Sequence, residues 1–251
     1  MLKRVLLKIA YDGTNYCGWQ IQENGITVEQ IINEKLGELL GEEITVIGAS
    51  RTDSGVHALG NVAVFDTETR IPAEKISFAL NQRLPADIRI QESREVAPDF
   101  HPRHCNSKKT YEYKILNRRF AVPTERLYSH FVYMPLDVEK MKKGAEYIVG
   151  EHDFKSFCSS RSQVENTVRT IYRLEIKKEG DMIHMIICGN GFLYNMVRII
   201  VGTLIKVGLN IYPPEHVQEI IEARDRNAAG PKAAACGLTL IGIEYESFEE
   251  C

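Results

Sequence analysis

The chain has 251 residues, of which 44% are hydrophobic and 26% charged, and its formal net charge is 31 − 34 = −3. This composition excludes a disordered chain, and a chain of this length can bury a core that needs neither a disulfide nor a metal. The longest apolar stretch, residues 196–209, contains Arg198 and Lys206 and is too short to span a bilayer. The first eleven residues form a strand-like run with three basic side chains rather than a signal peptide, so we expect a cytoplasmic protein.

The first half of the chain alternates strand-like and helical segments. Residues 27–40 place apolar side chains at helical spacing, and Thr27 with Gln30 fits a capping box at the start of that helix. Asp12-Gly13 is a turn signal after the first strand, and Pro72 suits the first turn of a second helix. The predicted strands are residues 5–11, 44–49, 61–65 and 88–94, and the predicted helices are residues 27–40 and 72–84.

The second half repeats this order loosely. The predicted strands are residues 110–115, 131–134, 172–177, 182–188 and 238–245, and the predicted helices are residues 137–149, residues 193–207 and a helix that begins at Pro214. Short turns such as Glu179-Gly180 favour antiparallel pairing. We therefore predict an α+β fold with two halves, residues 1–103 and 104–251, each an antiparallel sheet covered by helices on one face.

Residues 48–58 form the most concentrated polar loop of the chain, between two predicted strands. Loops at the end of a sheet often carry functional residues. Asp53 is flanked by small residues and glycines, so it can approach a ligand closely and act as a nucleophile that forms a covalent intermediate. The alternative is an Asx-turn in which Asp53 caps its own backbone, and composition alone favours that alternative.

Residues 189–198 join a glycine-rich turn to an apolar helical run that contains Arg198. A buried arginine requires an anion, because an unpaired buried charge is strongly destabilising. A carboxylate facing Arg198 would have a lowered pKa and stay ionised, as a nucleophile requires. The alternative is an arginine whose stem packs while its guanidinium reaches water, and the sequence does not decide between the two.

Residues 103–126 carry seven basic and two acidic side chains, a net charge of +5 that leaves −8 for the rest of the chain. Within this run, residues 108–113 mix lysines with Tyr111 and Tyr113 on a predicted strand. Basic side chains can pair with phosphate, and an aromatic ring can stack on an extruded base. Core packing of the tyrosines and a merely solvated basic loop are the alternatives.

Metal and nucleotide chemistry receive little support from the motifs. His101, His104 and Cys105 stand close together but lack a second cluster of ligands, so we predict no metal site. Phosphate-binding glycine loops and a serine nucleophile elbow are absent from the sequence. We interpret His57 and His152 as structural histidines.

An ordered set of short segments spans nearly the whole chain. They are Tyr11-Asp12-Gly13-Thr14, Gly18-Trp19-Gln20, residues 51–58 (RTDSGVHA), residues 109–113 (KTYEY), residues 150–154 (GEHDF), Ser156-Phe157, residues 167–171 (TVRTI), residues 191–198 (GFLYNMVR) and Gly237-Leu238. In this order they resemble the A-type tRNA pseudouridine synthases. The resemblance implies two ferredoxin-like, RRM-like halves around an active-site cleft, a homodimer, and no cofactor.

The same resemblance assigns roles to residues. It makes Asp53 the catalytic aspartate, Tyr111 the tyrosine that contacts the target base, Arg198 the basic partner of the aspartate, and Arg51 a residue that holds the flipped nucleotide. Many family members have glycine where this chain has Ser50 and alanine where it has Ser54, small changes that bear on substrate preference more than on chemistry. The implied targets are uridines on the 3′ side of the anticodon loop and stem of tRNA.

The expected reaction isomerises uridine to pseudouridine. The uridine leaves its stack, Asp53 attacks the sugar or the base ring, and Tyr111 assists loss of the C5 proton. Phosphate contacts are expected from the basic run at residues 103–126, which includes Lys108 and Lys109, with help from Lys155, Arg161, Arg169 and Arg173. Three alternatives stay open: a relative with a shifted RNA target, a non-catalytic RNA-binding module, and an aspartate-dependent nucleoside hydrolase.

Overall fold

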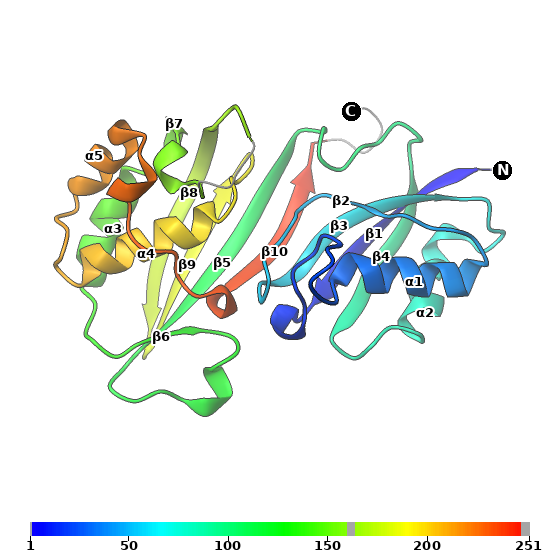
Figure 1. Cartoon of the computed structure of the whole chain (residues 1–251), viewed down its shortest axis with the longest axis horizontal. Helices are drawn as coiled ribbons and strands as arrows, with labels where there is room; N and C mark the ends of the chain where they lie inside the picture. Colours follow the sequence, from blue (N-terminus) through cyan, green and yellow to red (C-terminus); the bar gives the residue numbers. More distant parts are fainter. Residues whose placement is uncertain (1, 160–163, 247–251) are drawn as a thin grey trace. The chain divides into compact units, whose positions relative to one another are not determined.

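The structure is a computed structural model that describes residues 2–159 and 164–246. It divides into two compact units, drawn together in Figure 1. The first unit runs from the N-terminus to Ser107 and resumes at Leu240, and the second unit is Lys108–Thr239. Both mix helices with antiparallel strands, which confirms the predicted α+β class. None of the helices within the described residues is long and apolar enough to cross a membrane.

The first unit is a sheet with two helices. Its elements are β1 (Lys3–Tyr11), η1 (Gly13–Asn15), α1 (Val28–Leu40), β2 (Ile47–Gly48), β3 (His57–Thr67), α2 (Ala73–Asn81) and β4 (Ile88–Val96). Strand β1 lies between β4 and β3 and pairs antiparallel with both, and the short β2 pairs with β3. The apolar stripe predicted for α1 is buried at Val28, Ile32 and Leu36, and α2 packs beside it (Figure 1).

Two predictions for this unit need correction. The Thr27 side chain does cap α1 by accepting from the Gln30 backbone N–H at 3.3 Å, but the Gln30 side chain donates to Glu34 and so does not complete a capping box. The strand predicted at 44–49 is limited to Ile47–Gly48. The backbone N–H of Val46 donates instead to the side chain of Asn33 on α1, at 2.9 Å, so this residue is held to the helix rather than to the sheet.

The second unit is a sheet of the five strands β5 to β9 with three helices on one side (Figure 1). Its elements are β5 (Ser107–Asn117), η2 (Pro123–Glu125), β6 (His130–Val132), α3 (Val138–Glu146), β7 (Gly150–Asp153), η3 (Lys155–Phe157), β8 (Val168–Glu179), β9 (Met182–Gly189), α4 (Met196–Gly208), α5 (His216–Ala223), η4 (Arg226–Ala228) and η5 (Ala235–Gly237). The strand order is β5-β9-β8-β7, with antiparallel pairing throughout this path. The three-residue strand β6 is the exception, since it runs parallel to β5.

Helix α4 is the centre of the second unit's core. All of its residues are buried except Arg198 and Lys206. Helix α3, capped by the side chain of Asp137, packs against α4 and β8. A Cβ at Gly202 would lie 1.7 Å from the Pro231 carbonyl oxygen, so the residue 230–233 segment approaches α4 at backbone contact distance. The periodic apolar run predicted to be a helix is therefore a helix buried on nearly all sides.

The last strand, β10 (Leu238–Tyr245), has the bounds that the sequence predicts. It follows β3 in the strand order, and the chain from Leu240 onward groups with the first unit, whereas the sequence division into 1–103 and 104–251 places it in the second half. The Tyr245 hydroxyl donates to the Pro102 carbonyl at 2.8 Å, and its ring meets Phe100 edge-on at 5.2 Å. These contacts attach the end of β10 to the first unit's core.

Candidate active site

The polar loop between β2 and β3 presents Asp53 at the start of a tight turn. The Val56 backbone N–H donates to the Asp53 carbonyl at 3.1 Å, and Gly55 has a φ of 76°, a conformation that favours glycine. Asp53 is half-buried, while its neighbours Thr52 and Val56 are buried. The turn therefore fixes the backbone on both sides of a carboxylate that solvent can still reach.

The segment Asp12–Trp19 lies against this turn along its whole length. The Trp19 N–H donates to the Thr52 carbonyl at 3.0 Å, and the Ser54 hydroxyl donates to the Tyr16 carbonyl at 3.2 Å. Read alone in the sequence, this segment is a glycine-rich turn with a packed tryptophan. In the structure it is a cradle for the Asp53 turn, and we use the name "cradle" for residues 12–19 below.

Two glycines allow the cradle to come this close. A Cβ at Gly13 would lie 2.0 Å from the Val56 carbonyl oxygen, and one at Gly18 would lie 2.7 Å from the Thr52 carbonyl oxygen. Gly18 also has a φ of 87°, which other residues rarely adopt. Any side chain at either position would push the cradle away from the Asp53 turn.

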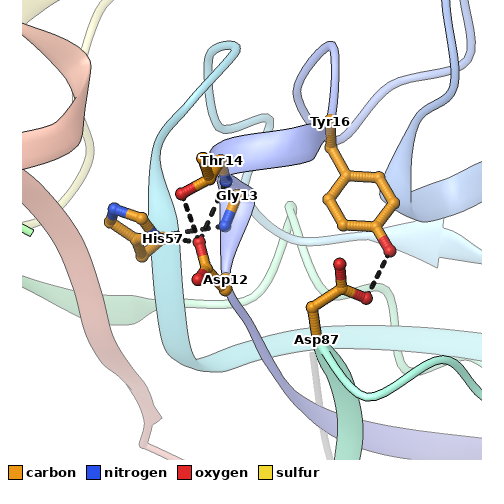
Figure 2. Close-up of polar contacts among 6 residues, drawn as sticks. All are labelled: Asp12, Gly13, Thr14, Tyr16, His57 and Asp87. Atoms are coloured by element: carbon orange, nitrogen blue, oxygen red, sulfur yellow. Dashed lines mark hydrogen bonds and ion pairs between the residues drawn. The ribbon is translucent and has the colours of Figure 1, made fainter. Parts of the chain in front are cut away.

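A compact polar cluster anchors the cradle to the sheet (Figure 2). Asp12 Oδ1 accepts from the Thr14 N–H at 3.0 Å and from the Thr14 hydroxyl at 2.6 Å, and it lies 3.0 Å from His57 Nδ1. The Tyr16 hydroxyl donates to Asp87 Oδ1 at 2.6 Å, and the Asp87 carbonyl accepts from the Asp12 N–H at 2.9 Å. Burial and this bond to the Asp87 carboxylate raise the pKa of Tyr16. The sequence marks Asp12 only as a turn residue and does not mark Asp87 at all, because their partners His57 and Tyr16 are distant along the chain.

The N-terminal side of the loop is held by a buried asparagine that the sequence analysis also missed. The Asn61 side chain accepts from the Ser50 N–H at 3.3 Å and donates to the Ser50 carbonyl at 3.1 Å, much as a neighbouring strand would. The Tyr11 hydroxyl bonds the Thr52 hydroxyl at 2.7 Å. Arg51 lies between these two anchored residues and is exposed. An exposed arginine on a fixed backbone suits the predicted contact with a nucleotide.

In the second unit, Tyr111 lies on β5 with its side chain buried at 8% exposure. Its ring meets Phe192 edge-on, with 5.1 Å between ring centroids. Phe192 belongs to the turn before α4 and was not singled out by the sequence analysis. Two aromatic rings in contact form an apolar surface that is suited to packing against a planar base.

Arg198 is half-buried on the first turn of α4. Its Nε donates to the Ala233 carbonyl at 2.8 Å, and its Nη1 donates to the Asn195 side chain at 3.1 Å. Asn195 has a φ of 62° and donates in turn to the Ser159 hydroxyl at 2.8 Å. These neutral acceptors fix the direction of the guanidinium, and its pairing with Asp53 stays a prediction.

The predicted RNA-binding residues are placed as follows. The Lys108 ammonium lies 5.6 Å from the ring centre of Tyr172, an exposed tyrosine on β8. Arg169 is partly buried, which lowers its pKa, and its Nη1 donates to the Asn166 carbonyl at 3.0 Å. Lys109 pairs with Gly189 in the β5–β9 ladder. Arg161 lies outside the described residues.

The four histidines that the sequence singles out, His57, His101, His104 and His152, lie as follows. The rings of His101 and His104 stack at 3.8 Å, and burial together with the charge of His104 lowers the pKa of His101. The described residues hold no group of three or more histidine, cysteine or acidic side chains that could bind a metal ion. His152 Nε2 lies 3.1 Å from the Val149 carbonyl. His57, the first residue of β3, is buried next to Asp12 of the cradle.

The first unit thus presents an aspartate on a braced turn, and the second unit presents basic and aromatic side chains, residue types that also occur in enzymes acting on nucleic acids. The family model described as tRNA pseudouridine synthase matches residues 8–104 and 145–246. "tRNA pseudouridine synthase A" of Thermoanaerobacter sp. (strain X514) is 48% identical over 244 residues, which cover 97% of this chain and 100% of the relative. The protein of the same name from Ruminiclostridium cellulolyticum (strain ATCC 35319 / DSM 5812 / JCM 6584 / H10) is 48% identical over 245 residues, again 97% and 100% of the two chains.

The chain therefore belongs to the tRNA pseudouridine synthase family. Among solved structures, a chain from "Structure of H/ACA RNP bound to a substrate RNA containing 2'-deoxyuridine" matches loosely, with 12% identity and a TM-score of 0.36 over 97% of this chain and 49% of that chain.

Proposed function

We propose that this protein isomerises uridine to pseudouridine in the anticodon stem-loop of tRNA, with Asp53 as the nucleophile. The membership of the family supports the reaction and the substrate class. The observation that carries the assignment to Asp53 is the cradle, which contacts the backbone of Thr52 and Val56 and the hydroxyl of Ser54 around this one carboxylate. Such bracing costs conformational freedom and excludes side chains at two positions, so it is consistent with a residue whose orientation matters.

The reaction conserves every atom of the uridine. The target base leaves its stack, since its reacting atoms are inaccessible within paired RNA. The Asp53 carboxylate adds to the sugar or to the base ring, the bond between ribose C1′ and N1 breaks, and the uracil turns so that C5 bonds to C1′. The carboxylate is then released, the proton on C5 leaves and N1 gains a proton. No oxidant, reductant or nucleotide is needed for this balance.

The second unit's residues receive supporting roles. Tyr111 is proposed to contact the target base and to assist departure of the C5 proton, directly or through water. Arg198 is proposed to keep the nucleophilic carboxylate ionised, because a nearby guanidinium lowers a carboxyl pKa. Arg51 is proposed to help hold the flipped nucleotide. Lys108, Lys109 and Arg169 are proposed to hold the RNA through its phosphates, so affinity should fall as salt rises. We further propose that the enzyme is a cytoplasmic homodimer that uses no metal.

The test compares the wild-type protein with an Asp53→Asn variant on unmodified tRNA transcripts. Pseudouridine is mapped at single-nucleotide resolution, and binding is measured in parallel. We expect wild type to convert uridines in the anticodon arm, and Asp53→Asn to lose about 1,000-fold or more in turnover while its affinity for tRNA stays within about twofold. Conversion by both proteins would remove Asp53 from its role. Binding without conversion by either would point to a non-catalytic module or to another RNA target.

A further inference from the structure

Asp12 and His57 form a clasp between the cradle and the strand that follows the Asp53 turn (Figure 2). Asp12 is the residue directly after β1 and the cap of η1, and His57 is the first residue of β3. Asp12 Oδ1 and His57 Nδ1 are 3.0 Å apart, and the histidine side chain is only 7% exposed. A buried contact between two chain segments that are distant in sequence has a cost in desolvation and side-chain entropy, so its position next to the turn calls for an explanation.

His57 Nδ1 has two partners that compete for its single in-plane position. The Gly13 N–H points at this nitrogen from 3.1 Å, which suits an unprotonated Nδ1. The Asp12 carboxylate suits a protonated Nδ1 that donates a hydrogen bond. In either state His57 is bound to the η1 turn, and that turn is the part of the cradle where a Cβ at Gly13 would collide with Val56.

The clasp is one of four contacts between the cradle and the chain around Asp53. Trp19 holds Thr52, Tyr16 holds Ser54, and Gly13 lies against Val56. Without the clasp, the side of the turn after Asp53 would lose its polar contact at His57 and keep the Ser54 hydroxyl bond to Tyr16 and the close approach of Gly13 to Val56. The turn could then rotate about its anchored N-terminal side and carry the Asp53 carboxylate with it.

We propose that Asp12 and His57 are positioning residues for the isomerisation, and that their clasp fixes the orientation of the Asp53 carboxylate. The inference rests on the proposed role of Asp53 as nucleophile. It assigns a catalytic consequence to His57, which the sequence alone interprets as a structural histidine. Misplacing a reacting group by about 1 Å can cost on the order of 100-fold in rate, so a clasp of this kind can matter without touching the substrate.

The experiment compares variants that break the clasp with variants that keep its polar contact. His57→Leu and Asp12→Ala break it. His57→Asn places an amide nitrogen where Nδ1 stands, and Asp12→Asn keeps both the cap on Thr14 and an acceptor for His57. The control is Asp66→Ala, which removes an ion pair with Arg4 (2.7 Å) at the other end of β3, in the same unit and away from the turn.

Turnover of tRNA, KM for tRNA and the unfolding midpoint are measured for each protein, with Asp53→Asn alongside. We expect kcat to fall about 10- to 100-fold in His57→Leu and Asp12→Ala with KM within about twofold of wild type. The double variant should be no slower than the worse single variant, because both remove one contact. His57→Asn and Asp12→Asn should restore most of the rate, and Asp66→Ala should keep the wild-type kcat.

Each other outcome overturns the inference. A wild-type kcat in His57→Leu, or a loss fully explained by the fraction of unfolded protein, would show that the clasp only stabilises the fold. A His57→Asn variant as slow as His57→Leu would mean that the imidazole acts chemically and not by position. If Asp53→Asn itself keeps turnover, the proposed nucleophile fails and the clasp has nothing to position; if only the clasp variants keep it, the nucleophile stands and the inference alone fails.

Discussion

The Asp53 turn in the first unit and the Arg198 helix in the second unit are both braced by a neighbouring chain segment, but by different means. The cradle holds the Asp53 turn through hydrogen bonds at Thr52 and Ser54 and through close backbone contact at Val56. The residue 230–233 segment holds Arg198 by lying flush on a buried helix, with the Ala233 N–H donating to the Arg198 carbonyl at 3.0 Å.

In the first unit, a substitution can therefore displace the site residue without destabilising the fold. In the second unit, a substitution that displaces the site residue also destabilises the fold. The Asp53 turn is only partly buried, with Ser54 exposed and Asp53 half-buried, so we expect that a change in the cradle can move the carboxylate while most of the core stays packed. Helix α4 is itself the core, so a change that displaces the 230–233 segment must also disturb buried packing. Substitutions in each region test whether the two respond in this way.

Gly202→Ala should have the largest effect on stability. Its Cβ would meet the Pro231 carbonyl oxygen at 1.7 Å, and backbone cannot move aside cheaply. We expect the free energy of unfolding to fall by about 3 kcal/mol, the upper part of the range for overpacked cores. Urea denaturation followed by circular dichroism measures it. A loss below about 0.5 kcal/mol, typical of a surface substitution, would show that the segment is not held against α4 as described.

Gly13→Ala should instead reduce turnover more than stability. The added Cβ pushes the cradle from Val56, which displaces the Asp53 turn without opening the core. We expect kcat to fall about 100-fold, while the free energy of unfolding falls by only about 1–2 kcal/mol. The matched control is Gly242→Ala in the same unit, since a Cβ there meets nothing within 4 Å. If turnover and stability fell in proportion, the cradle would not position Asp53 independently of the stability of the fold.

The elements that the sequence predicts well are those with a local signal. The apolar period of α4, the turn before β9 and the last strand all depend on neighbouring residues, and the structure agrees closely with each. The strand expected at 44–49 is mostly lost because Asn33, 13 residues before Val46, accepts the Val46 N–H. A side-chain acceptor at that distance leaves no periodic trace in the sequence.

The candidate site divides in the same way. Asp53 stands out in the sequence because small polar residues gather around it in one loop. The groups that brace it do not, since Asp12 meets His57 across 45 positions and Tyr16 meets Asp87 across 71. An aspartate directly after a strand and a histidine at the start of one are common in sequences. The antiparallel pairing of β1 with β3 is what brings Asp12 and His57 together. Gly13 and Gly18 likewise look like turn residues until the facing backbone is known.

The smallest expected effect concerns Tyr113, which contacts Ala234, the residue that follows the 230–233 segment. Its hydroxyl donates to the Ala234 carbonyl at 2.8 Å, and burial, with a smaller contribution from Cys236, raises its pKa. A tyrosine of the unfolded chain has a pKa of about 10, so below that pH both states keep the proton and Tyr113 adds no pH dependence. Above it, the unfolded state loses its proton first, and the folded state is disfavoured by up to about 1.4 kcal/mol per pH unit.

Stability should therefore fall as the pH rises above 10, and Tyr113→Phe should make that fall shallower. Urea denaturation at pH 9 and at pH 11 measures the slope for both proteins, and the value at pH 9 gives the cost of the lost hydrogen bond, about 1 kcal/mol. Equal slopes would mean that the buried hydroxyl is not the group that titrates. A shallower slope with unchanged turnover at pH 9 would show that Arg198 keeps its function without the Tyr113 hydroxyl bond. The 230–233 segment would then still be packed against α4.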